Sequence, residues 1–128
     1  MEHTPSELKY TKSHEWCKED DEGNIVVGIT AHAQTLLGDL VFVELPEEEQ
    51  NFKAGDEVAV VESVKAASDV YCPISGEVVA VNTKLTKQPE LINEDCYGEG
   101  WIFKIAPSDS DEINELMDAD AYAELIEE

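Results

Sequence analysis

"EVAVVESVKAASDVYCPISGEVVAVN", residues 57–82, decides the fold of this chain. Three short valine-rich runs, at 57–63, 68–74 and 77–82, show the composition and alternation of half-buried β-strands. The one lysine of the stretch, Lys65, falls in the connection between the first two runs. The stretch therefore predicts a β-hairpin with a lysine near its tip, followed by a third strand.

Similar runs lie on both sides of this hairpin. They are short, rich in Val or aromatic residues, and bounded by Gly, Pro, Asn or Asp. These further predicted strands cover residues 14–20, 24–29, 40–45 and 100–105. Many short strands joined by tight turns are typical of an antiparallel sandwich or barrel, so we expect a mainly β fold.

Helical spacing interrupts the strands in two places. One predicted helix begins at a potential cap, Thr30, and ends at Gly38. Its shared apolar face comprises Ala33, Leu36 and Leu37. Near the C-terminus, apolar stripes at 113–117 and 122–126 predict two short helices separated by residues 118–120.

The charge balance argues against several classes of partner. Thirty acidic residues stand against eight lysines, without any arginine, and give a net charge of −22. Such a chain could not neutralise a row of phosphates, which argues against nucleic acid and anionic membranes as partners. The charge favours partners with basic docking surfaces, although a solvated acidic surface without specific meaning explains it equally well.

Length and the remaining composition are unexceptional. The 128 residues fit one domain, residues 1–128, that can bury a core without metals or disulfides. Cys17, Cys72 and Cys96 are far apart and the histidines are scattered, which favours reduced thiols and no metal site. No apolar run reaches the roughly 18 residues of a membrane span, and no signal or transit peptide is recognisable, so we expect a cytoplasmic protein.

Spacing alone leaves the role of Lys65 open. A lone lysine in a turn is most often a solvated surface residue. Schiff-base chemistry is an alternative, but it needs a lysine whose pKa is depressed by burial or a neighbouring cation. An exposed tip beside Glu62 and Asp69 offers neither. Because no base–nucleophile pattern accompanies the lysine or the cysteines, a lysine or cysteine enzyme is the least favoured class, and no catalytic residue is expected.

A series of short motifs follows in order along nearly the whole chain. They are HEW (14–16), GIT (28–30), HAQ (32–34), GDLVFVELP (38–46), AGD (54–56), VESVKAASDVY (61–71), PISGEV (73–78), VN (81–82), PELIN (89–93) and YGEGW (97–101). Each is weak alone, but together they resemble the glycine cleavage H-protein family of lipoyl carriers. Biotinyl domains usually flank their lysine with Met, and 2-oxoacid dehydrogenase lipoyl domains place Asp before it. The neighbours Val64 and Ala66 favour the glycine cleavage carrier.

The resemblance implies a fold and a function. The fold would be a flattened β-barrel, or barrel-sandwich hybrid of two antiparallel sheets, with a lysine-bearing hairpin, one short internal helix and C-terminal helices. Lipoate would be joined by an amide to Lys65 of a monomeric, non-catalytic carrier. The carrier would take the aminomethyl group of glycine from the pyridoxal-phosphate-dependent glycine decarboxylase to a tetrahydrofolate-dependent aminomethyltransferase. It would then present its dithiol to dihydrolipoyl dehydrogenase.

The resemblance also implies roles for residues around the lysine. Glu62 and Gly76 match positions for recognition by the lipoate-attaching enzyme. Glu62 is equally explained as a solvated strand end, and the SG pair can need a glycine with positive φ at position 76. A groove sheltering the loaded arm would comprise Ser13, Glu15, Ile29, Leu37 and Asp69. Its two carboxylates would hydrogen-bond the terminal amine and its two aliphatic side chains would cover the arm, although ordinary strand carboxylates and core aliphatics are a simpler interpretation.

Two departures and two alternatives stay open. Cys72 stands where Ser or Ala is more usual in the family, and Cys96 where Pro or another small residue is. A mixed disulfide between Cys72 and the dithiol is conceivable, but buried thiols are the simpler expectation. An H-like lipoyl donor to other complexes would share the same hairpin. An acidic interaction module without a cofactor is the alternative from another class.

Overall fold

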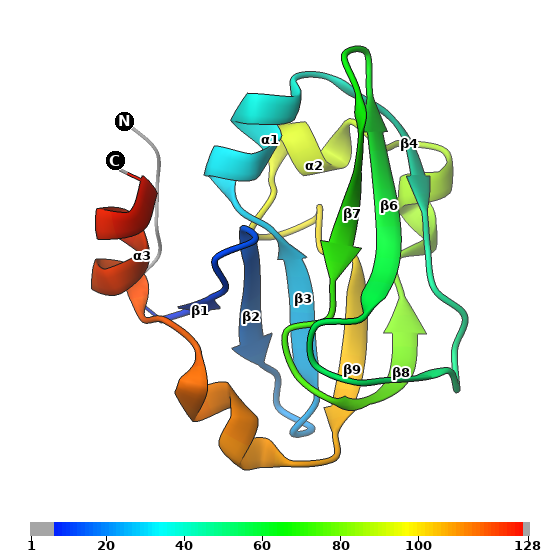
Figure 1. Cartoon of the computed structure of the whole chain (residues 1–128). Helices are drawn as coiled ribbons and strands as arrows, with labels where there is room; N and C mark the ends of the chain where they lie inside the picture. The colour runs from blue at the N-terminus through cyan, green and yellow to red at the C-terminus, as the bar shows by residue number, and fades with distance from the viewer. Residues whose placement is uncertain (1–6, 127–128) are drawn as a thin grey trace.

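A computed structural model describes residues 7–126 as two antiparallel β-sheets with helices at the periphery (Figure 1). The six-stranded sheet has the order β1-β2-β3-β9-β8-β5 and comprises β1 (Lys9–Tyr10), β2 (Glu15–Glu19), β3 (Ile25–Ile29), β9 (Phe103–Pro107), β8 (Gly76–Val81) and β5 (Asn51–Phe52). The three-stranded sheet has the order β4-β6-β7 and comprises β4 (Leu40–Glu44), β6 (Glu57–Ser63) and β7 (Ala67–Tyr71). The helical elements are α1 (Ala31–Leu37), α2 (Leu91–Glu94), α3 (Ala119–Ile126) and the 3₁₀ helices η1 (Thr83–Thr86) and η2 (Ser110–Glu115).

The main core lies between the two sheets. In β3, Ile25, Val27 and Ile29 point inward and are buried, whereas Val26 points outward. The opposing sheet contributes Val43, Val61 and Val70 to the same core. Each sheet therefore buries one face against the other, as the alternating valine-rich runs predict, and the mainly β fold is confirmed.

A second apolar cluster covers the outer face of the six-stranded sheet. Trp16 of β2 is buried there, and its indole N–H donates a hydrogen bond to the Cys96 carbonyl oxygen at 2.9 Å. Tyr10 and Tyr122 stack with ring centroids 4.7 Å apart, which attaches α3 to β1. The Tyr122 hydroxyl also lies 2.7 Å from the Thr30 hydroxyl, at the start of α1. The C-terminal helix thus supports both the sheet and α1.

The predicted strands are confirmed with shifts at their ends. The strand at 57–63 has the observed bounds of β6. The strand predicted at 100–105 begins later, at Phe103, because Gly100 is packed against α2. A Cβ at Gly100 would lie 2.7 Å from the Ile92 Cα atom. The strand predicted at 68–74 is wrong at its C-terminal end and stops at Tyr71.

The predicted internal helix is confirmed as α1. The Thr30 hydroxyl accepts a hydrogen bond from the Ala33 N–H at 3.2 Å, and Gly38 ends the helix with a φ of 85°. Leu36, however, does not share the buried face expected for it, because its side chain is 59% exposed.

The predicted C-terminal helices are η2 and α3. The first is a 3₁₀ helix, capped by the Asp109 side chain, which accepts from the Asp111 N–H at 3.0 Å. Met117, predicted to share its stripe, lies outside the helix and instead forms a β-bridge with Tyr10. Within residues 7–126, no helix is long and apolar enough to cross a membrane.

Candidate functional site

The β6–β7 hairpin ends in a short, internally bonded turn that carries Lys65. The Ser63 N–H donates to the Ala66 carbonyl oxygen at 2.8 Å. The Ser63 hydroxyl oxygen accepts from the N–H groups of both Lys65 and Ala66, each at 3.1 Å. A serine side chain that closes a turn in this way makes the backbone at the tip well defined. The lysine therefore has a fixed base.

The tip also rests on the corner between α1 and β4. The Val64 N–H donates to the Asp39 carbonyl oxygen at 3.1 Å. The lysine stem lies over Gly38, where an added Cβ would stand 3.4 Å from the Lys65 Cε atom. The positive φ of Gly38 at the end of α1 is the reason for a glycine here, because an added Cβ would make only an ordinary contact with the lysine stem.

Asn93 holds this corner in place. Its side-chain carbonyl oxygen accepts from the Leu40 N–H at 2.8 Å. Its side-chain N–H₂ donates to the Gly38 carbonyl oxygen and to the Gln34 Oε1 atom, both at 2.9 Å. One amide therefore joins α2 to α1 and β4 directly beneath the tip. This role was not predicted from the sequence, where its only signal is the Asn that closes the PELIN motif.

The Lys65 ammonium is available at this tip. The residue is exposed, and the salt bridges found among residues 7–126 join Lys84 to Glu99 and Lys104 to Asp20 rather than involving Lys65. The end of its side chain lies over Gly38, and the residue as a whole is exposed to water. These properties fit an attachment point for an acyl group, because acylation here would disturb no internal ion pair.

Glu15 lies at the other end of β7 and is buried. Its Oε1 atom accepts hydrogen bonds from the hydroxyls of Thr11 at 2.5 Å and Ser13 at 2.6 Å. Its Oε2 atom accepts from the Tyr71 N–H at 3.1 Å, which joins β2 of one sheet to β7 of the other. Burial raises the pKa of Glu15, and the hydrogen bonds from Ser13, Thr11 and Tyr71 oppose that rise.

The remaining residues predicted for the groove lie on three elements, β3, α1 and β7. Ile29 is buried on β3 directly opposite Glu15, and Leu37 is half-buried at the end of α1. Asp69 is exposed on β7, two residues from Tyr71 and hence on the same face of the strand. From Ala67 to Tyr71, β7 spans roughly 13 Å. The structure thus brings Ser13, Glu15 and Ile29 together. Asp69 lies nearer to the tip along β7, on the outer face of the three-stranded sheet beside Glu44 and Val60.

The two positions predicted for recognition differ strongly. Glu62 is exposed on β6, next to the turn, and pairs with Ala67. Gly76 is buried and begins β8, the strand that follows the end of β7 farthest from the tip (Figure 1). The expectation of a positive φ is wrong, because the glycines with positive φ are at 23, 38 and 55. Instead, a Cβ at Gly76 would overlap the Ala106 carbonyl oxygen of β9. The glycine is needed for the close approach of two strands.

The cysteines lie inside the protein rather than at the tip. Cys17, Cys72 and Cys96 are all free and buried. The Cys72 thiol donates to the Ile74 carbonyl oxygen at 2.9 Å. Burial raises the pKa of Cys17 and of Cys72 to about 12 and that of Cys96 to about 11. None of the three is therefore placed or activated for exchange with a dithiol on the surface.

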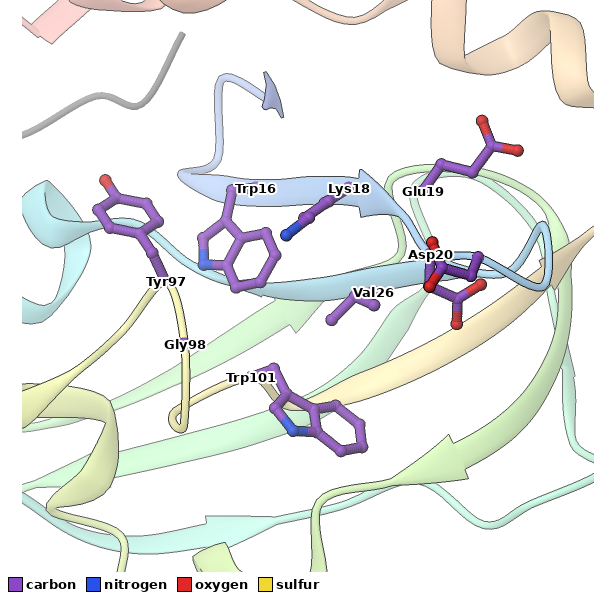
Figure 2. A pocket seen from close by; sticks show the side chains of 9 residues that line it. Trp16, Lys18, Glu19, Asp20, Val26, Tyr97, Gly98 and Trp101 are labelled. Atoms are coloured by element: carbon purple, nitrogen blue, oxygen red, sulfur yellow. The ribbon is translucent and has the colours of Figure 1, made fainter. Parts of the chain in front are cut away.

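A shallow surface pocket of about 310 Å³ lies elsewhere, on the outer face of the six-stranded sheet (Figure 2). Trp16, Tyr97 and Trp101 line one part of it and Glu19 and Asp20 another, as Figure 2 shows. Trp16, Lys18 and Val26 in its wall alternate along β2 and β3 with residues that point into the main core. The wall therefore faces away from the three-stranded sheet. The pocket is therefore separate from the lysine hairpin.

The fold and the hairpin together define a class: a small two-sheet carrier domain that presents one exposed lysine on a firmly held turn. The model of the family described as glycine cleavage H-protein matches residues 8–128. The chain belongs to the glycine cleavage H-protein family, whose members are the lipoyl carriers of the glycine cleavage system.

Relatives and a solved structure agree with this assignment. Glycine cleavage system H proteins of Shewanella sp. (strain ANA-3) and Shewanella denitrificans are each 58% identical over 128 residues, covering 100% of this chain and 99% of the relative. A crystal structure of a glycine cleavage system H protein from Mycobacterium marinum has 41% identity and a TM-score of 0.84. The match covers 93% of this chain and 95% of the chain in the crystal structure. The expected family and two-sheet fold are confirmed, and the chain is a carrier component of that system.

Proposed function

We propose that lipoate is attached by an amide to Lys65 and that this chain is a monomeric, single-domain carrier without catalytic activity of its own. The observation that carries the proposal is an exposed lysine whose stem lies over Gly38, on a turn that Ser63 and Asp39 hold in place. Attached lipoate supplies a disulfide/dithiol pair that accepts a one-carbon amine fragment and two electrons. The role of the chain is to hold, present and shelter that group.

The attachment reaction uses the Lys65 amine as nucleophile. The ammonium first loses a proton, and the neutral amine attacks the carbonyl carbon of an activated lipoyl donor, such as an acyl phosphate anhydride. A C–N bond forms, the bond from the acyl carbon to its leaving group breaks, and the nitrogen loses a second proton. All of this chemistry belongs to the attaching enzyme. The carrier contributes a lysine that is free of internal ion pairs within residues 7–126.

The two groove carboxylates have different tasks in this proposal. Glu15 already receives hydrogen bonds from Thr11, Ser13 and Tyr71, so its part is to position the groove wall. Asp69 is exposed on the strand that leads from the tip, and it is the carboxylate available to a cationic group brought along β7 by the arm. Ile29 and Leu37 would exclude water from the arm.

The partners in this proposal are glycine decarboxylase, the aminomethyltransferase, dihydrolipoyl dehydrogenase and the lipoate-attaching enzyme. Tethering keeps the transferred group at high effective concentration while the carrier visits each of them. The net charge of −22 would accelerate encounters with basic docking surfaces without requiring tight complexes. Carrier turnover should therefore fall as ionic strength rises, and turnover that is unchanged between low and physiological salt would contradict this.

Mass spectrometry tests the proposal directly. The full chain is treated with a lipoate ligase, lipoate and ATP, and both the intact protein and the tryptic peptide containing Lys65 are weighed. We expect one lipoyl group on that peptide, and none on a Lys65→Ala variant that unfolds at the wild-type temperature because the tip adds little to the core. A lipoyl group elsewhere, or no modification of the wild type, would contradict the proposal.

A second assay, glycine–bicarbonate exchange with the decarboxylase, separates a glycine cleavage carrier from a lipoyl donor to other complexes. Exchange supported by the lipoylated chain is expected of the carrier.

A further inference from the structure

Large apolar side chains gather around the tip of the lysine hairpin. They are Leu36, Val41, Phe42 and Val64, with exposed fractions of 59%, 55%, 47% and 70%. Elsewhere in residues 7–126, the exposed large apolar side chains are Val79 and Leu125, each at 38%. Single exposed apolar residues are ordinary, but a group of this kind marks a contact surface. We call Leu36, Val41, Phe42 and Val64 the collar.

The backbone contacts place the collar around Lys65. Val64 precedes the lysine, and its N–H is bonded to Asp39 at the start of β4. Phe42 of β4 lies opposite Glu62 of β6, next to the turn. Leu36 is in the last turn of α1, beside the glycine on which the lysine stem rests. Figure 1 shows the end of α1, the start of β4 and the hairpin tip at the same end of the molecule.

A β-bulge is responsible for half of the collar. Leu40 pairs with Ser63 and Phe42 pairs with Glu62, so Val41 is an extra residue without a partner on β6. The bulge leaves two consecutive side chains, Val41 and Phe42, exposed, where strict alternation would bury one of them. β4 is also an edge strand of its sheet. Exposed apolar residues on an edge strand favour association, so their retention here points to a partner that covers them.

We propose that the collar is the docking surface for the enzyme that acylates Lys65, and that this enzyme surrounds its lysine entrance with apolar side chains. The inference rests on the proposed function of Lys65. A lysine amine extends only about 6 Å from the backbone, so an enzyme that forms a bond to it must enclose the tip. Enzymes that act at the far end of the finished arm can stand farther away. The acylating enzyme must therefore contact the collar, whereas the other enzymes need not.

The charges beside the collar predict the charges around the lysine entrance of the acylating enzyme. Asp39 and Glu62 flank the collar, and neither takes part in a salt bridge found within residues 7–126. Lysine or arginine side chains around the entrance would complement them and increase the rate of encounter, while the apolar contact would set the lifetime of the complex. The two contributions are separable, because salt screens the first and leaves the second nearly unchanged.

The rate of lipoyl attachment tests the collar. Unmodified full-length carrier is treated with a lipoate ligase, lipoate and ATP, and the intact mass is followed over time. Phe42→Ser, remote from Lys65 in sequence, should lower kcat/KM roughly tenfold through KM, as loss of an apolar anchor does. Val79→Ser on β8 is the matched control and should react at the wild-type rate. The ratio of wild-type to Phe42→Ser rates should be the same at low and physiological salt.

A competition experiment measures docking without the reaction. Lys65→Gln cannot accept a lipoyl group but keeps the collar, so it should inhibit attachment to the wild type. The Lys65→Gln/Phe42→Ser double variant should inhibit about tenfold less well. Modification of Lys65→Gln itself would overturn the proposed function. Equal inhibition by both variants would overturn the docking role of the collar but not the proposed function. The same conclusion would follow if a folded Phe42→Ser protein were lipoylated normally but impaired in glycine–bicarbonate exchange. The collar would then serve the decarboxylase.

Discussion

Replacing Gly76 by Ala tests whether this glycine is a structural requirement. The added Cβ would overlap the Ala106 carbonyl oxygen and stand 3.0 Å from the Ile105 Cγ1 atom. A backbone obstacle cannot rotate away, so the cost lies at the upper end of the ~1–3 kcal/mol typical of overpacking. The lower entropy of the unfolded alanine chain offsets under ~1 kcal/mol, which leaves about 2–3 kcal/mol. With ~2.1 cal/mol/K of unfolding entropy per residue over 128 residues, Tm should fall by roughly 7–11 °C.

Calorimetry on the full chain measures this shift, and Gly55→Ala is the control. Gly55 has a φ of 93° and open space around an added Cβ, so its replacement reports backbone strain without a clash. A Gly76→Ala variant as stable as the wild type would refute the packing argument. The same variant separates two explanations of the glycine in lipoylation. A folded but unmodified protein would mean direct recognition, whereas loss of modification that tracks loss of folding would mean that the strands β8 and β9 were forced apart.

Three further predictions concern polar groups that are buried or partly buried. Burial raises the pKa of Glu15 in the folded state, so the folded protein binds this proton more tightly than the unfolded chain. In urea unfolding, the free energy of unfolding of the wild type should fall relative to that of Glu15→Gln as pH rises from about 4.5 through the folded-state pKa. A wild type that instead becomes more stable relative to Glu15→Gln over this range would contradict the assignment. Asn93→Ala should cost ~2–3 kcal/mol in the same assay, because it leaves the Leu40 N–H unpaired, and a change below ~0.5 kcal/mol would exclude its role at the corner. At pH 8, a pKa of about 12 leaves roughly one thiolate in 10⁴ for Cys17 and Cys72, and a pKa of about 11 leaves roughly one in 10³ for Cys96. The three buried cysteines should therefore resist iodoacetamide in the native state and give three adducts after unfolding, and native labelling would show that they are accessible.

Alternation and turn residues predicted most of the strands because those signals are local. The run at 57–63 coincides with β6, and Thr30 and Gly38 mark α1 as their residue types indicate. The two-residue strands β1 and β5 were missed, since so short a segment shows no periodicity and exists only through its partner. The bulge at Val41 was missed for a similar reason: its extra residue is defined by the register with β6.

In the candidate site too, features set by neighbouring residues in the sequence could be predicted, whereas features set by distant residues could not. The family motif singled out Lys65 as the proposed attachment site, whereas spacing alone left it an ordinary surface lysine. Burial of Glu15 could not be predicted, because its hydrogen-bond donors include the Tyr71 N–H, 56 residues away in sequence. Gly76 was recognised as special for the wrong physical reason, since the obstacle to a side chain is backbone from β9. Asn93 escaped notice because an amide reveals its partners only in three dimensions.

The two ends of the β6–β7 hairpin differ in what they contribute: one end stabilises the fold, and the other carries the proposed attachment site. At one end, Glu15 ties β7 to β2 through the Tyr71 N–H, so changes there disturb both sheets. At the other end, the lysine and most of its neighbours are exposed, and the turn is held by backbone groups and the Ser63 hydroxyl. Substitutions of exposed tip side chains should therefore alter modification and docking at little cost in folding free energy, because surface positions seldom contribute more than ~0.5 kcal/mol. A carrier that must be recognised by several enzymes gains from this arrangement, since its recognition surface can change while its core stays the same.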